Sequence, residues 1–351
     1  MAMLADTVEL VIGVDTHKHT HTAAVVVAAT GAMIQQVTVP AAPAGYRQLL
    51  KLAGQHQGQR VWAIESTGGY GAGLTRFLQA HAEQVLELDR PKRVARRHGA
   101  KSDPLDAIRA AREALGRDQL AQPRAAGHRA ALSVRLAARR SAVQAATDAQ
   151  RQLHALVVAA PDSLRGRLRG LTTPRLVATC GRLRQQTTWD VETAATAISL
   201  RALARRIQLL NAEIADHTSA ITTLVRAWRP DLLSRTGVGP IVAAIVLSAW
   251  SHAGRCRTDA AFAMLGGAAP IPASSGQTVR VRLNRSGDRQ LNQALHLVVL
   301  TRLRYDPATR AYAQRRRAQA KTNREIRRCL VRYVARQLYR LLEANPRFDP
   351  T

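Results

Sequence analysis

The first quarter of the chain consists of short apolar runs separated by polar breaks, a pattern typical of β-strands. Residues 8–39 are rich in β-branched side chains and are interrupted at His17–His21 and at Thr30-Gly31, which predicts strands joined by hairpins. The pattern then predicts a helix over residues 44–54, a strand over 60–65, a helix over 71–81 and a strand over 84–88. Because helices and strands alternate, we predict an α/β domain with a mixed sheet over residues 1–125.

From about Arg129 the apolar positions recur every three or four residues, which indicates long helices. A first run comprises Leu132, Leu136, Val143, Ala146, Leu153 and Val157, and a second, more regular run comprises Leu200, Leu203, Ile207, Leu210, Ile214, Ile221, Leu224 and Trp228. This spacing predicts a coiled coil or helical hairpin over residues 126–230, with the chain reversing within 161–188. Two partners remain open for the second run: the first run of the same chain, or a second protomer.

Residues 231–351 are predicted to form a third, mainly helical domain. The stretch from Arg235 to Pro240, followed by an apolar helix, resembles a helix-hairpin-helix turn. In such a turn Gly237 and Gly239 would let backbone N–H groups approach a DNA phosphate at a helix N-terminus. The tail beyond Arg302 is helical and basic, and we expect its arginine cluster to contact nucleic acid: Arg315, Arg316 and Arg317.

The charge of the chain points to a polyanionic partner. Lys and Arg number 52 against 24 Asp and Glu, a formal net charge of +28, and only five of the cations are lysines. Arginine pairs bidentately with phosphate, so nucleic acid is the expected partner. A coding bias toward arginine explains the shortage of lysine but leaves the shortage of acids unexplained.

Several features bear on location. No segment approaches the roughly 20 apolar residues of a membrane span, and the first ten residues lack the pattern of a signal peptide. Cys180, Cys256 and Cys329 fit neither a zinc-binding pattern nor a disulfide framework. We therefore expect a cytoplasmic, nucleoid-associated protein without a membrane partner.

In so basic a chain the positions of the acids are informative. Asp15 ends the apolar run VIGVD, Glu65 ends the run VWAIE, and Asp103 and Asp106 lie three residues apart at the start of a helix. Taken alone, Asp103-Pro104 is also a good helix opening. Four acids that converge would repel one another unless divalent cations bridge them, and oxygen ligands suit Mg²⁺ or Mn²⁺. Together they predict metal-dependent cleavage of phosphodiesters.

The phrases GVDTHKHTHTAAVV, AIESTGGYG and KSDPLDA, in this order, resemble the DEDD-type transposases of insertion sequences, in the family numbered one hundred and ten. The resemblance covers nearly the whole chain. It implies a RuvC-like, RNase H-type N-terminal domain, a coiled-coil middle and a C-terminal transposase domain. It also implies that Asp15, Glu65, Asp103 and Asp106 hold the catalytic metal.

The resemblance further implies a nucleophilic serine before a glycine in the C-terminal domain. The matching residue is Ser275, with Ser274 the close alternative, and Arg280, Arg282 and Arg285 would neutralise the scissile phosphate. Relatives have Ile-x-Lys-x-Gly downstream of the serine, whereas this chain has Leu283-Asn284-Arg285-Ser286-Gly287. Arg285 keeps the charge of that lysine but cannot titrate near neutral pH.

By the same resemblance, the chain would recombine double-stranded DNA through a phosphoserine–DNA intermediate. Its active site would be shared between protomers of a dimer or tetramer, and a structured non-coding RNA, the bridge RNA, would guide it to its targets.

Three other functions remain open. A junction nuclease would hydrolyse DNA with water, and Ser275 would then be structural. A tyrosine recombinase would use His296, Arg302 and Tyr305, but it would leave the acids unexplained. A non-catalytic nucleic-acid-binding protein would bind without cleaving.

Overall fold

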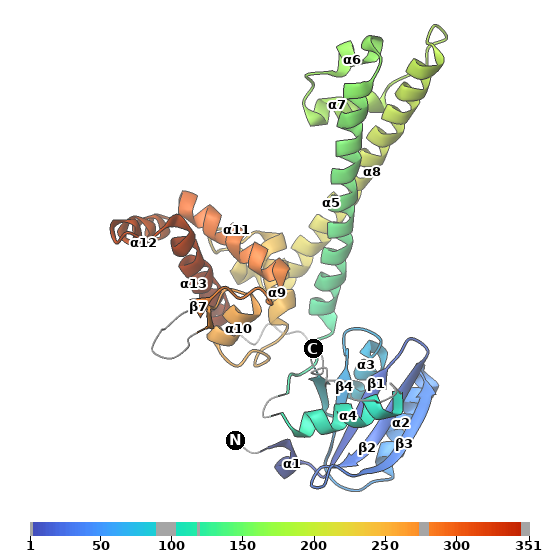
Figure 1. Ribbon diagram of the computed structural model, residues 1–351, viewed down its shortest axis with the longest axis vertical. Helices are drawn as coiled ribbons and strands as arrows, with labels where there is room; N and C mark the ends of the chain where they lie inside the picture. The colour runs from blue at the N-terminus through green and yellow to red at the C-terminus, as the bar shows by residue number, and fades with distance from the viewer. Residues whose placement is uncertain (1–2, 89–102, 118–119, 274–280, 345–351) are drawn as a thin grey trace. The chain divides into compact units, whose positions relative to one another are not determined.

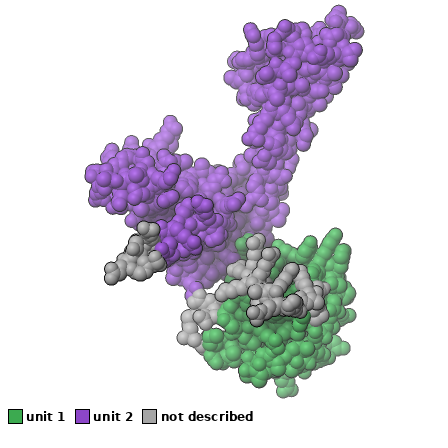
Figure 2. Space-filling model, in the orientation of Figure 1, with its two compact units in different colours: residues 1–126 green, residues 127–351 purple. Residues whose placement is uncertain are grey.

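The protein consists of an α/β unit followed by a mainly helical unit, which agrees with the predicted fold class. In the computed structural model the described residues are 3–88, 103–117, 120–273 and 281–344. They divide into two compact units, residues 1–126 and residues 127–351 (Figure 2). Within the described ranges, no helix is long and apolar enough to cross a membrane.

The first unit is built on a five-stranded mixed sheet (Figure 1). Its strands are β1 Leu10–Thr16, β2 Thr20–Val27, β3 Met33–Pro40, β4 Arg60–Glu65 and β5 Val85–Leu88, in the spatial order β3-β2-β1-β4-β5. Strands β1 to β3 pair antiparallel through the two predicted hairpins, whereas β4 runs parallel to β1 and β5 runs parallel to β4. The helices are α1 Leu4–Thr7, α2 Pro43–Gly54, α3 Ala72–Ala80 and α4 Asp103–Leu115.

Helices cover both faces of this sheet. Because side chains alternate along a strand, Ile12 and Trp62 face one side, where they form a core with residues of α2 and α3. Val11 and Val61 face the other side and share a core with alanines of α4. Their alanine partners are Ala110, Ala111 and Ala114.

Helix α4 approaches β1 closely because β1 has a glycine at its centre. A Cβ atom added to Gly13 would lie 2.1 Å from the carbonyl oxygen of Ala107 and 2.5 Å from the backbone nitrogen of Ala111. Both are backbone atoms of α4, so no side-chain movement would relieve the overlap. Gly13 therefore allows the helix to lie directly on the strand.

We expect replacement of Gly13 by Ala to destabilise the first unit by about 1–3 kcal/mol, because the added methyl group overpacks the contact between β1 and α4. Urea unfolding, together with hydrogen exchange of the β1 and α4 peptides, measures the loss. Gly54→Ala is the matched control, since a Cβ there meets nothing within 4 Å. Equal unfolding midpoints for Gly13→Ala and the wild type would contradict this reading of the contact.

The second unit begins with a long helical hairpin. Helices α5 Gly127–Ala159 and α8 Val191–Trp228 pack along one another, and α6 Asp162–Leu168 and α7 Thr173–Gly181 lie at the end where the chain reverses (Figure 1). The remaining elements are η1 Pro230–Leu232, α9 Pro240–Trp250, α10 Asp259–Leu265, β6 Ile271–Pro272, β7 Val281–Arg282, α11 Arg289–Tyr305, α12 Pro307–Ala318 and α13 Asn323–Ala344.

Part of the apolar seam of α8 is buried within the chain, whereas Leu203, Leu210, Ile214 and Leu224 are half-buried. Leu200 and Ile207 share a core with Leu153 of α5, and Trp228 shares a second core with Leu132. These two cores lie at opposite ends of an antiparallel pair, so the seam packs against the first helical run. The alternative that it mainly contacts a second protomer is therefore wrong for its fully buried positions.

Two details of the hairpin differ from the sequence expectation. Val143 is 37% exposed, whereas Ala142 and Ala149 are buried. The reversal at 161–188 contains two short helices, each opened by a proline near its first turn: Pro161 and Pro174.

A buried cation joins the end of the hairpin to the last helix. Arg229 is 1% exposed and donates to both carboxylate oxygens of Asp231, at 2.8 and 2.7 Å. It also donates to the carbonyls of Leu341 and Leu342 near the end of α13. The bonds from Arg229 hold the pKa of Asp231 below its usual value. This pair fixes the C-terminal helix to the base of the hairpin.

Candidate functional site

Two of the predicted acids lie side by side at the carboxyl ends of parallel strands. Val14 of β1 is in register with Ile64 of β4, so the residues that follow, Asp15 and Glu65, are neighbours across the pair. Adjacent strands are about 4.8 Å apart. The Thr16 hydroxyl donates to the Glu65 carbonyl at 3.1 Å, which holds the two strand ends together.

The first turn of α4 lies over the same face of the sheet at the same end. Asp15 and Glu65 lie two residues beyond Gly13 and Ala63, so their side chains project toward the same face of the sheet, the α4 side. Ala107, in the first half of α4, contacts Gly13, and the far end of α4 lies near α1, which precedes β1. The helix therefore runs with its N-terminus toward the strand ends.

That N-terminus carries the remaining two acids. Asp106 is half-buried and accepts a hydrogen bond from Arg109 at 2.9 Å. Asp103 is the first residue of the helix, and its side chain lies outside the described residues. Asp15, Glu65 and the start of α4 thus share one corner of the sheet.

Asp15 is partly buried beside an imidazole. Its carboxylate is 14% exposed, and its Oδ2 lies 3.1 Å from Nε2 of His17. Burial of a carboxylate is costly unless cations or hydrogen-bond donors surround it. The His17 imidazole is one such partner, which makes the partial burial of Asp15 less costly.

The donors at this corner fit a hard divalent cation. Asp15 and Glu65 offer carboxylate oxygens on one face, the ligand type that Mg²⁺ and Mn²⁺ prefer. Among the described side chains, no three His, Cys, Asp or Glu lie close enough together to hold a metal ion. The side chain of Asp103 is not among the described ones.

The predicted serine lies outside the described residues. Ser274, Ser275 and Arg280 belong to the segment between β6 and β7. The two strands that flank it pair antiparallel, with Ile271 opposite Arg282. Arg282 and Arg285 are exposed on the chain that follows.

The phrase that departs from the family pattern forms a fixed turn. Asn284 is 7% exposed, donates to the Met264 carbonyl at 3.0 Å and accepts from the backbone and the hydroxyl of Ser286. A Cβ on Gly287 would lie 2.3 Å from the Gly267 nitrogen. Asn284 and Gly287 therefore shape the turn that presents Arg285, a role that the sequence pattern alone did not reveal.

The two glycines of the hairpin-like turn have different surroundings. Gly237 has a φ of +85°, and a Cβ there would lie 3.0 Å from the Val298 carbonyl of α11. Its conformation and small size are thus required by internal packing. Gly239 immediately precedes α9, and a Cβ there would meet nothing within 4 Å.

The arginine cluster lies at the end of α12. Arg315 lies over the Tyr312 ring, Arg316 donates to Gln319, and Arg317 donates to Asn323 at 3.0 Å. All three are in the last turn of the helix, where their positive charge interacts favourably with the negative end of the helix dipole.

The three side chains that a tyrosine recombinase would use, His296, Arg302 and Tyr305, do not converge on one point. His296 and Tyr305 are on the same helix, nine residues and therefore about 13 Å apart along its axis. Arg302 is engaged by the Thr236 carbonyl and by Gln337. This arrangement does not present the three side chains to a single phosphate.

Comparison with known proteins identifies the class. A family model for DEDD transposases matches residues 12–160, and a model described as transposase IS116/IS110/IS902 family matches residues 230–314. The first match contains the two strand-end acids and α4, and the second contains the turn at Gly237 and the β6–β7 region. The protein is therefore a transposase by class.

Two relatives agree with these matches. An uncharacterized 43.6 kDa protein of insertion element IS110 from Streptomyces coelicolor is 32% identical over 158 residues, which are 44% of this chain and 37% of that protein. An uncharacterized 42 kDa protein of insertion element IS900 from Mycobacterium paratuberculosis is 26% identical over 84% of this chain and 85% of its own length. The chain belongs to the IS110 family of insertion-sequence transposases.

Proposed function

We propose that the protein cleaves and rejoins double-stranded DNA to move its own insertion sequence within the bacterial cytoplasm. The observation that supports this most directly is the side-by-side position of Asp15 and Glu65 at parallel strand ends, under the first turn of α4. The strand order β3-β2-β1-β4-β5, antiparallel and then parallel, supports assignment of the unit to the RuvC-like, RNase H-type fold.

In this proposal Asp15, Glu65, Asp103 and Asp106 hold Mg²⁺ or Mn²⁺. When bound, the ion supplies positive charge at the scissile phosphate and favours departure of the leaving oxygen. The His17 imidazole, 3.1 Å from Asp15, positions that carboxylate. The chain's own contribution would be to bring these acids to one corner of the sheet, where the ion would offset their mutual repulsion.

Ser275 is the proposed nucleophile. Its Oγ–P bond forms while the bond between phosphorus and the leaving sugar oxygen breaks, which gives a phosphoserine–DNA intermediate. Because the phosphodiester energy is retained, rejoining needs no ATP. Arg280, Arg282 and Arg285 would neutralise the phosphate. The serine and the acids would come from different protomers, so we propose a dimer or tetramer.

We also propose that a structured non-coding RNA selects the DNA. Base pairing would then provide the sequence choice, and the protein would read mainly phosphate and shape. The excess of arginine and the shortage of aromatic side chains, 4% of the chain, support this division. The turn at Gly237 and Gly239 and the cluster Arg315–Arg317 are proposed phosphate contacts.

The guided function predicts a specific RNA in the purified protein. We expect protein from cells that carry the non-coding DNA flanking its gene to retain one abundant RNA from that DNA, and to recombine matching substrates only with Mg²⁺ or Mn²⁺. Sequencing of the bound RNA and a recombination assay with and without EDTA test both points. Protein from cells without the flank is the control. Random cellular RNA in both preparations, with unguided recombination, would exclude the guided function.

A further inference from the structure

The second unit contains a groove that includes Arg282 and Arg285 at one side, whereas most of its lining has no role in the proposed chemistry. Its cavity, of about 1170 Å³, is bounded by β7 and the turn after it, by α11, by the end of α12 and by the first half of α13. Smaller cavities continue it at both ends, one sharing Arg282 and Leu283 and the other sharing Leu300 and Arg327. We call this continuous depression the C-terminal groove.

The charge of the C-terminal groove is strongly positive. Among the described residues, nine arginine and lysine side chains line its main cavity, against one carboxylate, that of Glu325. Glu325 accepts hydrogen bonds from the backbone and hydroxyl of Thr322, both at 2.9 Å, as the cap of α13. Glu325 therefore caps the start of α13, and the excess of positive charge in the groove favours binding of a polyanion.

The walls of the groove also expose large apolar side chains. Val281 is 65% exposed, Leu283 is 50% exposed and Leu300 is 47% exposed. Side chains of this size are normally buried, and here they lie among guanidinium groups. A ligand that fits both must combine negative charge with apolar surface.

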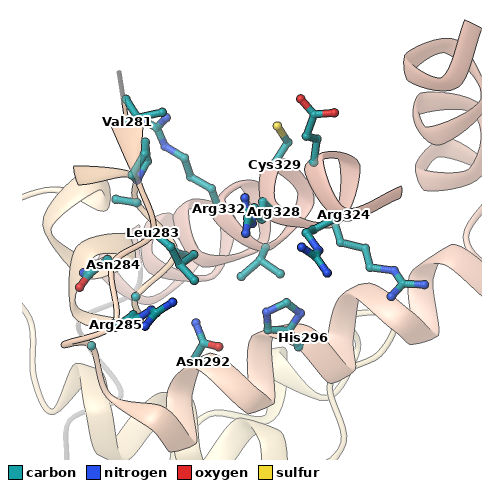
Figure 3. Close-up of a pocket in the computed structure, with 18 of the residues that line it drawn as sticks. Val281, Leu283, Asn284, Arg285, Asn292, His296, Arg324, Arg328, Cys329 and Arg332 are labelled. Carbon is teal, nitrogen blue, oxygen red and sulfur yellow. The ribbon is translucent and has the colours of Figure 1, made fainter. Parts of the chain in front are cut away.

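Polar groups project into the same space. Figure 3 shows Asn292 and His296 rising from α11 toward Arg328 and Arg332 of α13. Burial and the nearby charge of Arg327 lower the pKa of His296, so the imidazole is neutral at pH 7 and offers one donor and one acceptor. Nε of Arg332 is buried and, in the described part of the chain, has no hydrogen-bond partner.

We propose that the C-terminal groove binds a single-stranded segment of nucleic acid, with phosphates on the arginine rim and bases against the apolar walls. In a duplex the base faces are stacked and only edges and phosphates are exposed, so a duplex cannot cover Leu283 and Leu300 in this way. The inference rests on the proposed function, because strand exchange and guide pairing both require unpaired strands.

The test measures binding without cleavage. Fluorescence anisotropy in EDTA compares the full-length protein on a 12-nucleotide DNA strand, an RNA strand of the same sequence and the corresponding DNA duplex. We expect Arg324→Gln/Arg328→Gln to weaken single-strand binding about tenfold and to reduce its salt dependence, since two phosphate contacts are lost. Arg167→Gln/Arg184→Gln is the charge control. It removes two exposed arginines of the 161–188 reversal, outside the described lining of the groove, and should change the affinity less than twofold.

The role of the apolar wall of the groove is tested by a substitution that leaves the net charge unchanged. We expect Leu300→Gln to weaken single-strand binding about fivefold and duplex binding less than twofold. Leu297→Gln is the matched control, because Leu297 is on the same helix, 49% exposed, and does not line the groove. The DNA and RNA strands distinguish the two sources of the ligand, and a loss with either supports the proposal.

Two results would overturn it: groove variants that keep wild-type affinity for both single strands, or variants that weaken duplex and single strand equally. Because the measurement uses no metal and no cleavage, it is independent of the acids at the sheet. An Asp15→Asn protein should bind like the wild type, so failure of the groove and failure of the cleavage proposal are separate observations.

Discussion

Replacement of Asp15 by Asn is expected to reduce metal-dependent DNA strand cleavage by at least a thousandfold, while the protein stays folded and still binds DNA. Asn keeps the size of the side chain and one oxygen, but removes the negative charge that a divalent cation requires. A thousandfold loss corresponds to about 4 kcal/mol of transition-state stabilisation, a magnitude that loss of a metal ligand can account for.

The measurement is the rate of strand cleavage on a radiolabelled substrate at saturating protein, with thermal unfolding as a check on the fold. Asp162→Asn is the matched control, since this aspartate is 88% exposed at the far end of the helical hairpin, where it pairs with Arg165. Near-wild-type cleavage by Asp15→Asn would remove the basis for a metal site at the sheet corner.

The strands and their acids could be predicted because their signal is local. A strand such as residues 60–65 is a continuous apolar run that ends in Glu65, and the structure has the strand within the same bounds. Once two such strands are parallel, their terminal acids must meet at one edge. The contact of Gly13 with Ala107 could not be predicted, because it depends on which helix returns to that face.

The hairpin was only partly predictable. Periodicity identified both long helices, but not which face of α5 lies closest to α8. The predicted run included Ala146, which is buried, but it also included Val143, which is 37% exposed, and it missed the buried Ala142 and Ala149. Apolar periodicity identifies a face by size and hydrophobicity, whereas close packing of two helices selects small residues.

The sequence indicated some of the cations of the C-terminal groove, Arg282, Arg285 and Arg316, but not the groove itself. Leu300 and Arg324 are far apart in the sequence and lie on different helices, and each looks like an ordinary exposed position. Their combination is visible only when α11, α13 and the turn fixed by Asn284 are in place. The serine, by contrast, was identified only through the family resemblance.

Replacement of Ser275 by Ala is expected to abolish the covalent protein–DNA adduct entirely. A serine ester of phosphate survives denaturation, so wild-type protein incubated with labelled substrate and Mg²⁺ should carry label through a denaturing gel. Alanine has no oxygen with which to form that ester, and metal binding by the acids should be unaffected, since Ser275 is not among the proposed ligands.

Ser274→Ala is the internal control, because it changes the adjacent hydroxyl in the same segment and leaves Ser275 in place. If Ser274→Ala loses the adduct and Ser275→Ala retains it, the nucleophile is Ser274. If both variants cleave at the wild-type rate and no adduct forms even with the wild type, water is the nucleophile and the enzyme hydrolyses DNA. A phosphoserine link is the one outcome that also explains rejoining without an external energy source, because the energy of the broken phosphodiester is held in the Ser–P bond until the new strand end attacks it.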